Sequence, residues 1–200
     1  MSAFSRTLIG MSVVSLAALP ATAITLDGVA DAGYTSIATD PANDLASPGP
    51  ADWAGTAWAD LTTLRVSNDA THLFVHIESL ALDQAGVNGD PSNGLYTLAI
   101  DLGTSEGTSA DPWGRAITYG HSNLPDFIVI GKIYGDYYGE FLTANGSNGW
   151  DGYGTDFAAS NVALADGNGI EIRIPLASLG VGVGNTINLL ALSSQEGETN

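Results

Sequence analysis

The sequence has no cysteine and only 5 Lys and Arg residues among its 200 positions. Because no disulfide can form, an apolar core, with or without a bound metal, must supply the stability of the fold. The scarcity of cations argues against nucleic acid and anionic membranes as partners, since proteins bind both polyanions with gathered Lys and Arg side chains. Neutral sugars and divalent cations remain as partner classes.

Acidic residues far outnumber the basic ones, and 22 Asp and Glu residues give a formal net charge of −17. All of them follow residue 26, where the remaining cations are scattered: Arg65, Arg115, Lys132 and Arg173. Such an excess of negative charge is typical of a solvated surface that keeps an exported protein soluble. A specific acidic site is the less favoured interpretation.

Long hydrophobic runs are missing too, except for one near the N-terminus. This run covers residues 8–19, follows the cation Arg6 and precedes the small-residue site Ala21-Thr22-Ala23. The pattern predicts a signal peptide over 1–23 that is removed on export. A membrane anchor is the competing interpretation, but it needs about 20 apolar residues. We therefore expect a secreted or cell-surface protein whose mature chain does not insert into a membrane.

Helical periodicity is nearly absent after residue 24, and apolar residues alternate with polar ones between Gly-, Asn-, Asp- and Pro-containing turns. The clearest unit is a predicted hairpin over 64–77. Further strands are expected at 96–100, 115–119, 127–134, 138–143, 162–164, 170–174 and 186–192, with one short helical turn at 175–179. Short strands without crossover helices predict one antiparallel β-sandwich domain over 24–200, with a closed barrel as the alternative. The chain stops soon after a predicted strand, which leaves open a longer natural product.

Motifs for catalysis are weak. Gly103-Thr104-Ser105-Glu106-Gly107 matches a nucleophile elbow, but Gly and Pro follow where the elbow needs a helix. His72 and His76 have the spacing of a helical zinc pair, yet four residues of a strand span roughly 13 Å. We expect both histidines on the exposed outer face of their sheet. No pair of carboxylates stands out for glycoside hydrolysis. The sequence thus predicts a protein that is not an enzyme.

Oxygen-bearing residues are concentrated in three loops, at 40–44, 101–111 and 145–156. Carboxylate, amide and backbone oxygens are the ligands that calcium prefers, so a structural calcium ion is the cofactor that this composition favours. None of the loops is an EF-hand, and Asx turns explain the same residues equally well. The metal ligands are therefore unknown.

Aromatic residues concentrate between positions 113 and 153. A flat ring stacks on the apolar face of a sugar while nearby amide, carboxylate and backbone groups bind the hydroxyls. In the competing interpretation several of these rings fill the core, since large aromatic residues are usually buried. The candidate carbohydrate-binding residues are Trp113, Tyr119, Tyr134, Tyr137, Tyr138 and Trp150.

Several segments carry a family resemblance, and the most specific is Asp111-Pro112-Trp113-Gly114-Arg115. The other segments are 24–28, 60–69, 73–75, 125–127 and 172–175. Together they resemble the accessory β-sandwich module of glucodextranases and amylopullulanases, which is similar to the family 9 carbohydrate-binding modules. The resemblance implies a jelly-roll-like antiparallel fold, a role in holding polysaccharide or the cell surface, and bound calcium. Such modules usually accompany a catalytic domain, whereas this one directly follows the predicted signal peptide.

Three functions follow from these patterns, in decreasing order of preference. The first is a secreted, non-catalytic carbohydrate-binding module for a neutral, α-glucan-like polysaccharide. The second is an extracellular or cell-surface structural or adhesion protein whose β-sandwich is stabilised by calcium. The third is a glycoside hydrolase, which ranks last because no catalytic constellation stands out.

Overall fold

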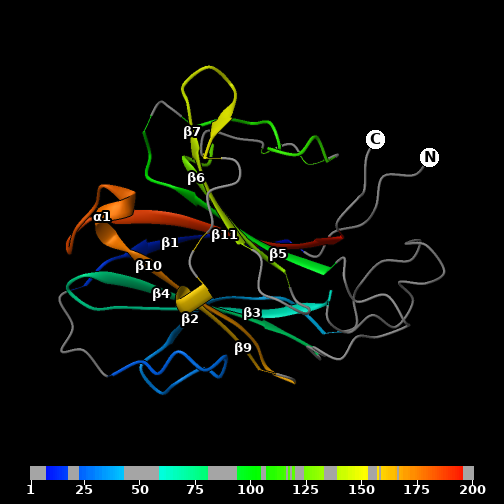
Figure 1. Ribbon diagram of the computed structural model, residues 1–200. Coiled ribbons are helices and arrows are strands. Elements are labelled where there is room, and N and C mark those ends of the chain that lie inside the picture. The colour runs from blue at the N-terminus through cyan, green and yellow to red at the C-terminus, as the bar shows by residue number, and fades with distance from the viewer. Residues whose placement is uncertain are drawn as a thin grey trace.

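Two antiparallel β-sheets packed face to face form the fold in the computed structural model (Figure 1). The structure describes residues 8–17, 23–42, 59–80, 94–104, 107–115, 117, 119, 124–132, 139–152, 157, 159–165 and 167–195. The predicted all-β sandwich is confirmed, and the two sheets do not close into a barrel.

The first sheet, sheet A, consists in spatial order of β1 (Leu8–Ser15), β11 (Thr186–Gln195), β5 (Gly94–Asp101), β6 (Phe127–Lys132), β7 (Gly139–Ala144) and β8 (Trp150–Asp151). The second sheet, sheet B, consists of β2 (Thr35–Thr39), β3 (Leu61–Asn68), β4 (His72–Ser79), β10 (Gly169–Pro175) and β9 (Val162–Ala165). Neighbouring strands are antiparallel throughout both sheets.

The predicted hairpin is the pair β3–β4, in which Leu64 lies opposite Ile77 and Val66 opposite Val75. These four side chains point into the space between the sheets, because alternate residues of a strand face the same side. The turn is closed by the Asp69 carboxylate, which accepts hydrogen bonds from the Thr71 and His72 backbone N–H groups at 2.7 Å each. An Asx turn thus sets the register of the hairpin.

Aliphatic side chains from both sheets fill the space between them. Among the largest fully buried side chains are Tyr96, Leu16, Leu61, Leu73, Leu98 and Ile100. In sheet A the inward positions of β11 are Ile187, Leu189 and Ala191, all without solvent exposure. This period-two burial explains why the alternation in the sequence located most strands correctly.

The predicted strand at 115–119 is wrong for its described residues Arg115, Ile117 and Tyr119, which belong to no strand. The Ile117 N–H donates to the Arg115 carbonyl at 2.5 Å, a three-residue turn that interrupts an extended ladder. Ile117 and Tyr119 are nevertheless buried, because they pack on the outer face of sheet A. Their alternation therefore reflects packing onto a sheet rather than pairing within one.

Residues Leu8–Ser15 of the run that we expect to be the apolar part of an export signal form strand β1, at the edge of sheet A. Val14 and Leu16 are buried in the core, whereas Val13 is 70% exposed and Ser15 is exposed as well. The run therefore alternates like a strand with one wet face. The export signal itself stays a prediction.

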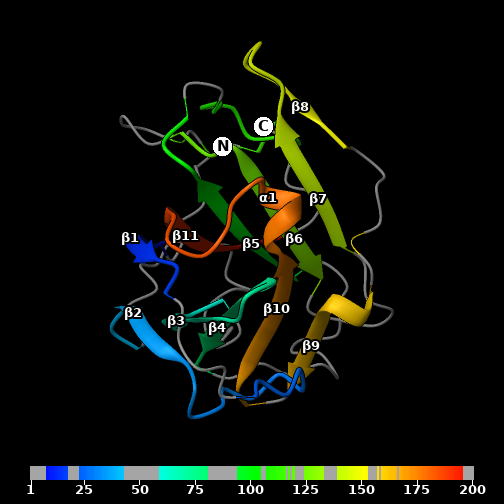
Figure 2. The same cartoon turned by 90° about the vertical axis from the view of Figure 1, so that its left-hand side faces the viewer.

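The short helix α1 (Leu176–Leu179) connects β10 of sheet B with β11 of sheet A at one end of the sandwich (Figure 2). It confirms the predicted helical turn. Gly180 ends the helix with a φ of 68°, the left-handed conformation that glycine adopts without strain. Within the described residues, no helix is long and apolar enough to span a membrane.

Candidate functional site

The outer face of sheet A carries a second apolar cluster that includes three of the predicted carbohydrate-binding residues. The buried members of this outer cluster are Ala99, Ile117, Tyr119, Ile128, Leu142, Ala144, Trp150 and Leu192. Trp113, Leu124 and Leu190 pack against it and are partly buried. The structure therefore brings Trp113, Tyr119 and Trp150 together over one sheet face.

The Asp111 carboxylate organises the turn that presents Trp113. One of its oxygens, Oδ2, accepts hydrogen bonds from the backbone N–H groups of Trp113 and Arg115, both at 3.0 Å. Gly114 has a φ of 71°, which allows the chain to fold back onto this carboxylate. The local sequence thus specifies a tight Asx-type turn.

Arg115 closes the same turn with its side chain. Its Nη2 lies 2.6 Å from Asp111 Oδ1, and its Nε lies 3.1 Å from both carboxylate oxygens. Nη1 donates to Ser194 Oγ at 2.6 Å, which ties the turn to β11. Both charged side chains are almost completely buried. A buried ion pair of this kind is stable only when such additional hydrogen bonds satisfy it.

The Trp113 ring is half-buried and lies against the guanidinium group of Arg115, whose Cζ is 4.9 Å from the ring centroid. This distance is within the range of a cation–π contact. The Arg115 guanidinium group holds the Trp113 ring in place. The exposed part of this ring is therefore an ordered aromatic surface that faces solvent.

Trp150 and Tyr119 are each only 5% exposed and pack into the outer cluster. The Trp150 indole N–H donates to the Ala110 carbonyl at 2.8 Å, and the Tyr119 backbone N–H donates to the Ser109 carbonyl at 2.9 Å. The Trp150 ring and the Tyr119 backbone thus hold the segment that carries Trp113. Tyr134, Tyr137 and Tyr138 lie outside the described residues.

Polar groups adjoin the same segment at the loop between β7 and β8. Thr108 Oγ1 donates to Asn148 Oδ1 at 2.8 Å, which joins this loop to the segment before Asp111. Asn145 Oδ1 accepts hydrogen bonds from the backbone N–H groups of Ser147 and Gly149. Residues 145–148 are exposed. Exposed amide groups that suit sugar hydroxyls therefore adjoin the segment that leads to Trp113.

A second polar cluster lies on the outer face of sheet B and escaped sequence reasoning. Glu171 on β10 is fully buried and accepts hydrogen bonds from the Asp27 and Gly28 backbone N–H groups and from the Tyr34 hydroxyl, at 2.6–2.8 Å. Burial raises the pKa values of both Glu171 and Tyr34. The glutamate at an outward strand position was visible in the sequence, but nothing indicated that residues 24–34 cover it.

The exposure predicted for both histidines on β4 is wrong for His76, which is only 1% exposed, and His72 is partly buried. Segment 24–34 covers His76, whose Nε2 lies 3.3 Å from the Gly28 carbonyl oxygen. Its Nδ1 lies 3.4 Å from Arg65 Nη1. Burial and the Arg65 charge both lower the pKa of His76. A neutral ring with the proton on Nε2 fits both contacts.

The carboxylates at one end of sheet A are occupied by protein donors. Asp126 accepts hydrogen bonds from the Leu102 backbone N–H and the Thr104 hydroxyl. Asp101 accepts hydrogen bonds from the Gly103 backbone N–H and the Asn188 side-chain amide. These are turn-stabilising contacts. The described ranges contain no group of three or more His, Cys, Asp or Glu residues placed to hold a metal ion. Ser105 of the elbow-like motif lies outside them.

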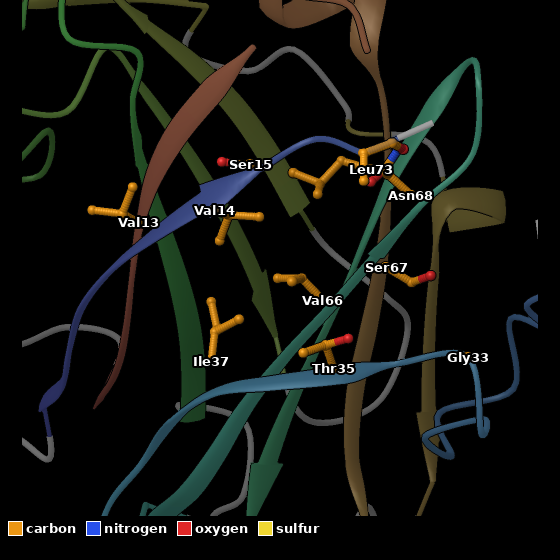
Figure 3. Close-up of a pocket in the computed structure, with 11 residues that line it drawn as sticks. Val13, Val14, Ser15, Gly33, Thr35, Ile37, Val66, Ser67, Asn68 and Leu73 are labelled. Carbon is orange, nitrogen blue, oxygen red and sulfur yellow. The ribbon is translucent and has the colours of Figure 1, made fainter. Parts of the chain in front are cut away.

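A cleft of about 190 Å³ lies between β1, β2 and β3 on another side of the sandwich (Figure 3). Its lining is mostly apolar and includes Val14, Ile37, Val66 and Leu73. Small-molecule sites usually measure about 300–1,000 Å³. The cleft is therefore too small for an oligosaccharide.

No family model matches this chain, and no curated protein matches it. The resemblance to glucodextranase accessory modules thus rests on the residues of the sequence alone, and the function must be argued from the geometry described above.

Proposed function

We propose that the protein is a secreted, non-catalytic carbohydrate-binding module for a neutral polysaccharide of the α-glucan type. The observation that carries this proposal is the half-buried Trp113 ring, which the Asp111–Arg115 ion pair holds over the outer cluster. An aromatic ring that is ordered before binding loses little conformational entropy when a sugar stacks on it.

Two further properties support a neutral sugar. The net charge of −17 disfavours acidic polysaccharides, because like charges repel. The exposed loop at 145–148 supplies amide and hydroxyl groups next to the segment that carries Trp113. Stacking against one ring, combined with hydrogen bonds from a polar rim, is the chemistry that a sugar requires.

Affinity electrophoresis of the exported protein tests the proposal, in gels that contain starch, pullulan, dextran, xylan or no polysaccharide. We expect one glucan to retard migration, and Trp113→Ala to weaken this binding at least about ten-fold. Val183→Ala is the matched control, because it removes an exposed apolar side chain from the turn before β11. It should migrate like the wild type in every gel.

Two results would contradict the proposal. The first is free migration of the folded protein in every gel. The second is a Trp113→Ala variant that binds as tightly as the wild type, because the ring then makes no contact with the glycan. Thermal unfolding of each variant separates lost binding from lost structure.

A further inference from the structure

Strand β1 pairs with the edge of β11 and faces β2 and β3 across the cleft of about 190 Å³ (Figure 3). We call the place that β1 occupies the slot. It pairs antiparallel with β11, with Ser12 opposite Leu189 and Val14 opposite Ile187. Across the slot, the Ser12 hydroxyl donates to the Ile37 carbonyl of β2 at 2.9 Å. One extended segment therefore bridges the two sheets at this side of the sandwich.

The slot distinguishes the two faces of its occupant. Val14 and Leu16 point into the core and are 7% and 1% exposed. Val13 points away and is 70% exposed. An occupant therefore needs aliphatic side chains at alternate positions and tolerates polar ones between them.

Backbone contacts fix one end of the slot. The Leu16 N–H donates to the Asn185 carbonyl at 2.9 Å, and the Gly184 N–H donates to the Leu16 carbonyl at 2.7 Å. The Asn68 amide donates to the Ala17 carbonyl at 2.9 Å. These groups recognise backbone atoms, so their contacts do not depend on the sequence of the occupant.

Without residues 1–23, β11 would become the edge strand of sheet A. The ten residues Thr186–Gln195 contain no charged residue and no proline. Exposed edges usually carry such residues, which prevent pairing with other chains. Loss of β1 would also uncover Ile37, Val66 and Leu189, which are now covered or partly covered.

We propose that the mature exported protein binds an extended, uncharged segment of another polypeptide in the slot that residues 8–17 occupy in the unprocessed chain. The segment pairs antiparallel with β11 and places aliphatic side chains where Val14 and Leu16 lie. This inference rests on the export signal of the proposed function.

The test uses the chain of residues 1–200, expressed with export, and a synthetic peptide of residues 8–17 carrying a lysine tail for solubility. The intact mass of the exported protein first establishes whether residues 1–23 are removed. We then expect the peptide to bind the processed protein and to raise its melting temperature. A Val14→Asp peptide should bind at least about ten-fold more weakly, because its carboxylate would enter the core. A Val13→Asp peptide should bind like the original.

Each other outcome overturns the inference. An exported chain that retains residues 8–17 keeps its slot filled, and the predicted signal is then wrong as well. A processed, folded chain that fails to bind the peptide contradicts binding in the slot but leaves the predicted export signal intact. Equal binding of both variant peptides to that chain has the same consequence. Glucan binding is measured separately in the gels described above, so its failure is distinguishable.

A second measurement covers the case in which the processed chain does not fold. In the unprocessed chain of residues 1–200, expressed in the cytoplasm, Val14→Asp should lower the melting temperature, whereas Val13→Asp should leave it within the error of the wild type. Equal effects of the two substitutions would show that the slot does not select between the faces of its occupant.

Discussion

At the scale of single residues, buried charges are the least predictable feature of this protein. The Asp111-Pro112-Trp113-Gly114-Arg115 motif stood out in the sequence. The sequence did not indicate that the two charged residues at its ends form a buried ion pair. Two desolvated charges are tolerated here because backbone N–H groups and Ser194 complete their hydrogen bonds. Those partners come from the turn itself and from the distant strand β11.

The buried His76 makes stability depend on pH in a defined direction. The pKa of His76 in the folded state lies below 6.5. Below that pH, His76 therefore binds a proton in the unfolded chain more readily than in the folded chain. Stability is therefore lost as the pH falls through 6.5, by at most about 1.4 kcal/mol per pH unit. We expect His76→Gln to lose less free energy of unfolding than the wild type between about pH 7.5 and about pH 5.5. Urea titrations at both values measure this difference.

Glu171 gives the stability of the fold a pH dependence opposite to that of His76, and it serves as the internal reference for this experiment. Its pKa is raised by burial, so its contribution is greatest at acid pH and is lost as the pH rises above 4.5. Both proteins in the comparison retain this glutamate. An identical pH dependence in His76→Gln and the wild type would mean that His76 binds protons equally well in the folded and unfolded chain.

At the scale of elements, the N-terminal segment 24–34 docks on sheet B through a glycine. Gly28 has a φ of 85°, and a Cβ atom there would lie 2.4 Å from the backbone of β9. Gly103 has a similar φ of 71° but open space around it. Replacing Gly103 by Ala should cost about 1 kcal/mol for the left-handed backbone alone. Gly28→Ala should cost about 2 kcal/mol more, because the segment must move off β9.

Urea unfolding of the two glycine variants measures these costs, and limited proteolysis reports whether residues 24–34 detach. We expect faster cleavage within that segment only in Gly28→Ala. Equal destabilisation by the two substitutions would show that β9 yields to the added methyl group, and that the segment is not fixed by close backbone contact.

At the scale of the whole molecule, the net charge of −17 opposes compactness. Salt screens this repulsion, with a Debye length of about 30 Å at 0.01 M and about 10 Å at 0.1 M. The melting temperature should therefore rise with NaCl over this range. The structural calcium ion that the sequence predicts would add a further rise at about 1 mM CaCl₂ that a chelator reverses and an equal ionic strength of NaCl does not reproduce.

The outcome of the calcium measurement also separates two roles of the acidic residues. A rise that MgCl₂ and CaCl₂ produce equally comes from general screening, and the acidic surface then serves solubility alone. A rise specific to calcium supports a structural site and favours the surface-protein function among the alternatives.

The sequence by itself determined the all-β class, the β3–β4 hairpin, most strand positions and the short helix α1. These features depend on period-two alternation, turn residues and helix caps, all of which are local properties. It also singled out the Asp111–Arg115 motif, but not the turn that this motif forms.

Only the tertiary structure decided which outward positions are covered. His76 and Glu171 are buried under segment 24–34, and Trp150 and Tyr119 form a cluster with strands distant in sequence. Strand alternation states which side a residue faces, but not what packs on that side. The same limit applies to residues 8–17, whose apolar run suits an export signal and an inward-facing strand equally, since both are selected by hydrophobicity.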